Sequence, residues 1–240
     1  LPLDTLPIPQ LIEIIEEGNT FEMSGFSGSN VARVGRDVID SSLPSALTTL
    51  FPEAQIDVIE IDQAVVNVAK EFFDFEVTDQ VSVIVNDARV YVKRAALLEK
   101  KYDLVILDAF TGDYIPEHLL TLEFLQEVRS IMTPDGVLVA NTFSTSRFYD
   151  HESETYQRAF GEFFNFKLPS SGNRIIIARD ELLPPRGKMM QTARDLAPRV
   201  RRFGVPLLEY PNRLSTRVDW DRSRRVLTDQ YSPSNLLRDN

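Results

Sequence analysis

The sequence predicts an α/β domain built on a doubly wound, mostly parallel sheet. The first observation is that short apolar runs alternate with longer amphipathic segments, a pattern typical of βαβ units. The second is that acids directly follow three of the apolar runs, where parallel strands would end together. The third is composition, because 240 residues with 43% hydrophobic content can bury a core of domain size.

Four apolar runs have the length and composition of buried strands. Amphipathic segments with i, i+3, i+4 spacing follow the first three runs and predict helices. Proline and glycine in Thr-Pro-Asp-Gly at 133–136 predict a turn before the last run. The predicted strands are 56–60, 81–85, 103–107 and 137–141, and the predicted helices are 65–73, 88–98 and 119–132.

The chain after the fourth strand predicts a further helix, a strand pair and an extension. The helix covers 152–164. The strands 166–168 and 174–178 form an antiparallel pair at the sheet edge, on either side of a Ser-Ser-Gly-Asn turn. A Pro-Pro-Arg-Gly break at 184–187 precedes a helix over 189–202.

Composition limits the chemistry that the chain can carry. Without cysteine the chain has no disulfides, thiolate zinc sites or cysteine nucleophiles, and two histidines predict no metal site. We expect both His118 and His151 to be solvated or capping residues. No apolar stretch approaches the length of a membrane helix, and the first residues lack the basic region of a signal peptide. We therefore expect a cytoplasmic protein without membrane contact.

Charge is unevenly distributed along the chain. The net charge is −10. Residues 1–185 hold 14 basic and 30 acidic residues, whereas 186–240 hold 12 basic and 6 acidic. An acidic body favours cationic or neutral small substrates over nucleic acid. We expect the basic tail to pair with the acidic body.

Three predicted strands end in acids: Glu60, Asp87 and Asp108. Because the carboxyl ends of parallel strands meet at one edge, where ligands bind, we expect these side chains to gather there. Glu60 stands where α/β nucleotide-binding folds place an acid for two ribose hydroxyls; capping of the next helix is the alternative, and Asp62 suits that role well. Asp108 directly follows an apolar strand and is suited to accept a proton from an attacking amine.

Residues beside these acids could line a ligand. Asp87 could accept from an adenine amino group, while the small Ala88 allows close approach. Asp113 adds a negative charge that could hold a cationic substrate, with a loop-turn role as the alternative. Tyr114 and Tyr231 could line an aliphatic chain or pack as lids.

Several blocks of sequence together carry a family pattern. They are Phe-Pro-Glu-Ala at 51–54, Asp-Val-Ile-Glu-Ile-Asp at 57–62, Asn-Asp-Ala-Arg at 86–89, Tyr-Asp-Leu-Val-Ile-Leu-Asp-Ala-Phe at 102–110, Leu-Thr-Leu-Glu-Phe at 120–124, Leu-Val-Ala-Asn at 138–141 and Leu-Thr-Asp-Gln-Tyr-Ser-Pro at 227–233. The chain resembles the spermidine synthase family, and most closely its looser group of spermidine synthase-like proteins. The resemblance covers about residues 42 to 142 and the block at 227–233, which is similar to the closing motif of the family.

The resemblance implies the Rossmann-like fold of class I adenosylmethionine-dependent methyltransferases, with an antiparallel edge pair. It also implies aminopropyl transfer from decarboxylated S-adenosylmethionine to a small cationic acceptor such as a polyamine, without metal or nucleic acid. A homodimer is left open. The implied residues are Glu60, Ile61, Asp87, Ala88 and Pro116 at the nucleoside, Asp108 as proton acceptor, and Asp113, Tyr114 and Tyr231 at the acceptor substrate.

Two other functions stay open. The family has a glycine-rich cofactor loop after its first strand, whereas residues 38–44 here contain no glycine. A non-catalytic binding or scaffold domain is therefore one alternative, and an S-adenosylmethionine-dependent methyltransferase is the other. We divide the chain into an N-terminal segment of uncertain structure (1–35), a Rossmann-like catalytic domain that binds the nucleoside (36–183) and a helical and irregular extension packed on it (184–240).

Overall fold

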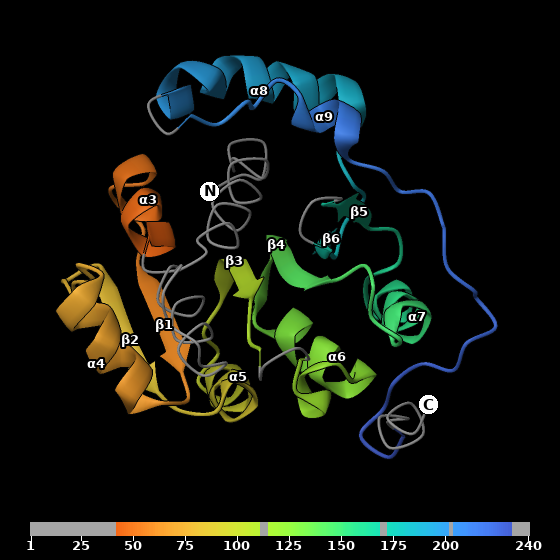
Figure 1. The fold of residues 1–240 in the computed structure, drawn as a ribbon, viewed down its shortest axis with the longest axis horizontal. Helices are drawn as coiled ribbons and strands as arrows, with labels where there is room; N and C mark the ends of the chain where they lie inside the picture. The colour runs from red at the N-terminus through yellow and green to blue at the C-terminus, as the bar shows by residue number, and fades with distance from the viewer. Residues whose placement is uncertain (1–41, 111–114, 169–171, 202–203, 232–240) are drawn as a thin grey trace, which may run out of the picture.

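The computed structural model describes residues 42–110, 115–168, 172–201 and 204–231 (Figure 1). Strands and helices alternate along the first two thirds of this part. The strands are β1 (Ile56–Glu60), β2 (Val81–Val85), β3 (Tyr102–Leu107), β4 (Met132–Phe143), β5 (Phe164–Lys167) and β6 (Asn173–Arg179). The helices are α3 (Ser42–Leu50), α4 (Gln63–Phe72), α5 (Ala88–Leu97), the 3-10 helix η2 (Glu117–Leu119), α6 (Leu122–Ser130), α7 (Tyr149–Phe160), α8 (Arg186–Val200) and α9 (Tyr210–Arg213).

The strands form two ladders within the described residues. β1 pairs with β2 in parallel. The second ladder has the order β3-β4-β6-β5, in which β3 and β4 are parallel and β6 is antiparallel to both β4 and β5. The α/β class with parallel strands and a terminal antiparallel pair is confirmed. Within the described residues the strands do not form one continuous sheet, because no ladder joins β1 to β3.

Helices cover both faces of the larger ladder (Figure 1). Alternate residues of a strand point to opposite faces. On β4, Val137 and Val139 belong to the core that includes residues of α3, α8 and α9. Leu138 and Ala140 belong to the core that α5, α6 and α7 cover. The strand is therefore buried on both sides, as doubly wound sheets require.

The predicted turn at 133–136 is wrong, because these residues lie inside β4. Tyr102 pairs with Met132 and Leu104 with Val137, so four residues of β4 bulge opposite a single residue of β3. A Cβ atom on Gly136 would lie 2.9 Å from the Thr133 carbonyl oxygen. The proline and glycine thus mark an irregularity in the strand, and glycine fits there because a side chain would collide with the backbone.

Local capping explains where the helices begin and end. Asp62 accepts from the Ala64 amide at 2.8 Å and starts α4, as its sequence position predicts. Thr121 accepts from the Phe124 amide at 3.2 Å and starts α6, so the predicted helix 119–132 is shorter and is preceded by η2. α7 ends before Gly161, whose φ of 80° suits a residue without a side chain.

The C-terminal extension packs on the larger ladder. Ala193 and Val200 of α8 and Tyr210 of α9 contribute to the core on the β4 face that carries Val137. Two of its arginines approach acids of α7: Arg222 lies 3.7 Å from Glu154 and Arg224 lies 3.9 Å from Asp150. No helix within the described ranges is long and apolar enough to cross a membrane. The proposed boundary before residue 184 stays a prediction.

Side chains connect the two ladders at Asp57. This β1 carboxylate accepts from the Tyr102 hydroxyl of β3 at 2.6 Å and from the Tyr91 hydroxyl of α5 at 2.7 Å. Lys100 lies 3.3 Å from the same oxygen and is half exposed. Burial alone would raise the pKa of Asp57, but the hydrogen bonds from Tyr102, Tyr91 and Lys100 outweigh it and lower that pKa.

We predict that Asp57→Asn destabilises the fold at neutral pH by about 1 to 3 kcal/mol, because two partly buried hydroxyls lose a charged acceptor. Lys100 contributes little to this, since solvent screens an exposed pair. A carboxylate with a lowered pKa stabilises the folded state above its unfolded pKa, close to 3.8, and this contribution is lost as pH falls through the folded value. Urea unfolding should therefore separate the two proteins at neutral pH, and the difference should shrink in acid. An equal difference at all pH values would contradict the role of the charge.

Candidate active site

Two of the strand-end acids are linked by neighbouring backbone at one edge. β1 and β2 are parallel and in register from Ile56 to Glu60, and the Asn86 amide donates to the Glu60 carbonyl at 3.0 Å. Asp87 therefore follows directly beside the end of β1. Asp108 follows β3, and the chain after it leads to η2, where His118 lies 3.0 Å from Asp87 Oδ2. The ends of β1 and β2 and the helix η2 thus meet at the start of α5, whereas the gathering of Asp108 with Glu60 and Asp87 stays a prediction.

Glu60 and Ile61 project at the end of β1. Glu60 is half-buried, and its Oε1 accepts from the Asp62 amide at 2.8 Å. Burial raises the pKa of Glu60 more than the backbone amides of Asp62 and Ile61 lower it. Ile61 is 69% exposed, which is unusual for a large apolar residue. A carboxylate and an open apolar surface lie next to each other here, and together they can contact the polar and flat parts of a nucleoside.

Asp87 has structural partners on both carboxylate oxygens. Oδ1 accepts from the Val90 amide at 2.9 Å and caps α5, while Oδ2 contacts His118 Nε2. Burial alone would raise the pKa of Asp87, but the hydrogen bonds from the Val90 amide and His118 outweigh burial, so the pKa is lowered. Ala88 is the first residue of α5 and is half-buried. A ligand amino group that approached Asp87 would have to share its oxygens with these donors.

Asp108 is half-buried at the end of β3. Asn141 Nδ2, from the neighbouring strand β4, donates to Asp108 Oδ1 at 2.9 Å. Pro116 is half-buried and precedes η2. Asp113 and Tyr114 lie outside the described residues. The loop between Asp108 and Pro116, which is predicted to contact the substrate, is thus described only at its two ends.

The closing motif is attached to α5 by a charged cluster. Arg89 donates to both carboxylate oxygens of Asp229 at 2.7 Å, and to Glu127 of α6 at 2.8 and 2.9 Å. The Arg89 hydrogen bond is the main cause of the lowered pKa of Asp229. Tyr231, in the same motif, lies against two other side chains: the guanidinium carbon of Arg225 is 3.8 Å from its ring centre, and the His151 ring centre is 6.5 Å away. Its role at the acceptor substrate stays a prediction.

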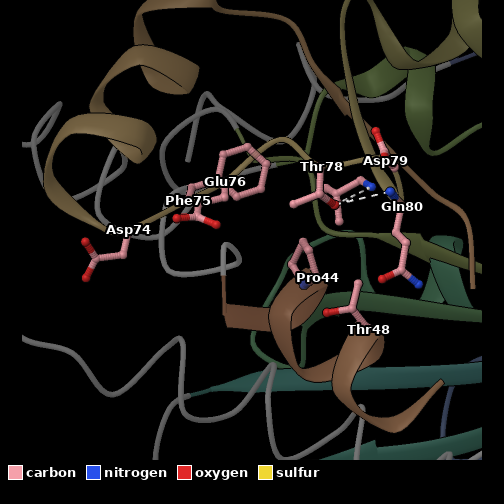
Figure 2. Close-up of a pocket in the computed structure, with 9 residues that line it drawn as sticks. Pro44, Thr48, Asp74, Phe75, Glu76, Thr78, Asp79 and Gln80 are labelled. Atoms are coloured by element: carbon pink, nitrogen blue, oxygen red, sulfur yellow. Dashed lines mark hydrogen bonds between the residues drawn. The ribbon is translucent and has the colours of Figure 1, made fainter. Parts of the chain in front are cut away.

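A hollow of about 400 Å³ lies at the other edge of the smaller ladder (Figure 2). Asp74, Glu76 and Asp79 line it, together with Pro44 and Thr48 of α3. It lies at the amino end of β2, since Val81 also lines it, whereas the strand-end acids lie at the carboxyl ends. This hollow is therefore separate from the candidate site.

The comparisons with known proteins decide the family. The model of the spermine/spermidine synthase domain matches residues 38–171. The chain belongs to the spermine/spermidine synthase family. It is 50% identical over 198 residues to a polyamine aminopropyltransferase from Vibrio vulnificus strain CMCP6, a match that covers 82% of this chain and 66% of that protein. The chain thus spans just under two thirds of that relative.

Solved structures show that this chain shares its fold with proteins outside its own family. A probable spermidine synthase from Corynebacterium glutamicum ATCC 13032 aligns with a TM-score of 0.54 at 18% identity, over 92% of this chain and 83% of that one. Human methyltransferase-like protein 13 in complex with SAH aligns with a TM-score of 0.59 at 24% identity, over 81% and 83%. Because identities this low show the fold alone, they confirm the class I methyltransferase-type architecture without separating the two reactions.

Three contacts of this spermidine synthase-family site were not predicted from the sequence. His118 is exposed, as expected of a solvated residue, but its contact with Asp87 was not predicted. No role was predicted for Asn141 apart from its place in the block at 138–141. Arg89 was not predicted to contact the closing motif. No short-range signal could have found them, because the partners lie 31 or more residues apart in the chain. Within the described ranges, no group of acids and histidines could hold a metal ion.

Proposed function

We propose that this chain transfers an aminopropyl group from decarboxylated S-adenosylmethionine to an amine of a polyamine. The observation that carries the proposal is the 50% identity to the Vibrio vulnificus polyamine aminopropyltransferase over 82% of the chain. The acidic character of residues 1–185 agrees with a cationic acceptor. Glu60 and Ile61 would contact the nucleoside, with Asp87, Ala88 and Pro116 at its rim.

The reaction itself needs alignment and one proton acceptor. The amine nitrogen attacks the aminopropyl carbon bound to the sulfonium, the C–S bond breaks, and its electron pair stays on sulfur in methylthioadenosine. For this attack the protonated amine first gives one proton to Asp108, which frees the lone pair of the nitrogen. Asp113 and Tyr114 would hold the cationic acceptor, and Tyr231 is a further proposed contact. Holding the two reactants in line supplies most of the acceleration.

Methyl transfer is the second candidate, because the fold also resembles a methyltransferase-like protein in complex with SAH. The experiment that separates the candidates is product analysis by mass spectrometry. The purified protein is incubated with a polyamine and either decarboxylated S-adenosylmethionine or S-adenosylmethionine. An aminopropylated polyamine supports our proposal, and a methylated amine supports the alternative. Nucleoside binding without either product would leave a binding domain and overturn both reactions.

We predict that Glu60→Gln weakens methylthioadenosine binding by about tenfold or more. A carboxylate can accept from two ribose hydroxyls, whereas the amide has one acceptor oxygen, and hydrogen bonds to charged groups contribute roughly 1.5 to 3 kcal/mol. Calorimetric titration measures the dissociation constant. Glu53→Gln is the matched control, because Glu53 is exposed and precedes the amino end of β1. An unchanged constant for Glu60→Gln would exclude the ribose role.

A further inference from the structure

Asn141 lies beside the proposed proton acceptor. Leu107 of β3 pairs with Ala140 of β4 in parallel register, so the next residues, Asp108 and Asn141, are neighbours across the two strands. Asn141 Nδ2 donates to Asp108 Oδ1 at 2.9 Å. Because the acceptor is a carboxylate, this contact is stronger than a bond between neutral groups. β4 thus holds one of the two oxygens of Asp108.

The amide of Asn141 is only partly satisfied. The residue is 2% exposed, and its Oδ1 has no hydrogen-bond partner in the described part of the chain. Turning the amide over would bring Oδ1 against a carboxylate oxygen, which would put two acceptors in contact. A buried acceptor without a donor lowers stability, and an apolar side chain of similar size would avoid that loss. The stability of the fold therefore does not explain an asparagine here, whereas the contact with Asp108 does.

The second oxygen of Asp108 is available. Among the residues that the structure describes, Oδ2 has no hydrogen-bond partner, and the side chain is half-buried rather than enclosed. A carboxylate held at Oδ1 loses rotational freedom, so Oδ2 keeps a constant direction. This matters because a displacement of about 1 Å between reacting groups can cost about 100-fold in rate.

We propose that Asn141 is a positioning residue that holds Asp108 Oδ1 so that Oδ2 receives the proton of the attacking amine. The inference rests on the proposed function, since it requires Asp108 to be the proton acceptor. Asn141 does not touch the substrate in this role. It acts through the orientation of Asp108, and the effect of its removal should therefore depend on the Asp108 carboxylate.

The test is Asn141→Leu, which keeps the branching of the side chain at Cγ and removes both polar atoms. We expect kcat for aminopropyl transfer to fall about 10- to 100-fold. The dissociation constant for methylthioadenosine should stay within about twofold, because the amide does not contact the nucleoside. The melting temperature should change by only a few degrees, because removal of the unsatisfied oxygen offsets the loss of the hydrogen bond to Asp108. A structural residue would show the opposite combination: lower stability and little change in kcat.

Asn165→Leu is the matched control. Asn165 is also a buried asparagine with an unsatisfied Oδ1, at 7% exposure, but it lies on β5, which β6 separates from β4. The kcat of Asn165→Leu should equal that of the parent protein. If Asn141→Leu fails to fold, Asn141→Ala avoids any overpacking. Loss of folding in both variants would show that the amide supports the fold and would overturn the inference.

A double-mutant cycle separates this inference from the proposed function. In the Asp108→Asn background, Asn141→Leu should cause no further loss of kcat, because the group that it positions is gone. Independent losses that multiply would overturn the positioning role. If Asp108→Asn itself keeps the parent turnover, the proposed proton acceptor fails, and the inference fails with it. If Asp108→Asn is impaired while Asn141→Leu is not, only the inference fails.

Discussion

Asp108→Asn is expected to lower kcat by about 100- to 10,000-fold, the range for loss of a positioned proton acceptor. At neutral pH the acceptor amine is protonated and has no lone pair for the attack on carbon, so it must lose a proton. Asparagine keeps the size of the side chain but removes the basic oxygen. The dissociation constant for methylthioadenosine should change little, because Asp108 is not proposed to bind the nucleoside. Steady-state kinetics and calorimetric titration measure the two quantities.

The matched control for Asp108 is Asp79→Asn. Asp79 is exposed and lies beside the amino end of β2, at the hollow on the opposite edge, so its replacement should leave kcat unchanged. A methyltransferase that acts on an amine would lose activity in the same way. The test therefore separates an enzyme from a binding domain, and the product mass identifies the reaction. Retention of parent turnover by Asp108→Asn would direct the search for the proton acceptor to Asp113.

The largest expected loss of stability comes from a buried charge cluster between β6 and α7. Arg174 is fully buried and pairs with Glu152, which is 2% exposed. The guanidinium also donates to the Thr142 hydroxyl at 2.8 Å and to the Ser153 hydroxyl at 2.6 Å. Its centre lies 4.3 Å from the centre of the Tyr149 ring. Burial raises the pKa of Glu152, and the Arg174 charge opposes that rise.

Arg174→Met should destabilise the protein by about 3 to 5 kcal/mol, because it leaves the Glu152 carboxylate buried without its partner. Without Arg174 the pKa of Glu152 rises further. A carboxyl group whose pKa is raised in the folded state costs no stability at a pH below its unfolded pKa, where it is neutral. It destabilises the folded state as the pH rises through its folded-state pKa. The loss relative to the parent should therefore be larger at neutral than at mildly acidic pH. Chemical denaturation at several pH values measures it.

Two controls test the explanation for Arg174. The double replacement Arg174→Met with Glu152→Leu removes both charges, so it should regain much of the lost stability. Arg224→Met breaks a pair of the same type on the surface, where Arg224 is 53% exposed, and should change stability by less than about 1 kcal/mol. A double variant that is no more stable than Arg174→Met would show that the loss arises from packing and not from the unpaired charge.

Features set by short stretches of sequence were predicted well. Apolar runs between acids gave the bounds of β1 and β2 without error, and Asp62 caps α4 as expected. The family resemblance is also confirmed, because it rests on contiguous blocks. The turn at 133–136 failed because proline and glycine are typical of both turns and bulges, and only the pairing of β4 with β3 distinguishes them.

The sequence by itself determined the α/β class, the family and the strand ends at which acids occur, because strand period, turn composition and family blocks are all local properties of the chain. Tertiary structure alone decided which side chains meet: Asp87 with His118, Asp108 with Asn141, and Arg174 with Glu152. These partners lie 22 to 33 residues apart. Their contacts depend on how strands and helices pack, and hydrophobic patterns, which direct burial, do not specify which polar groups are brought together.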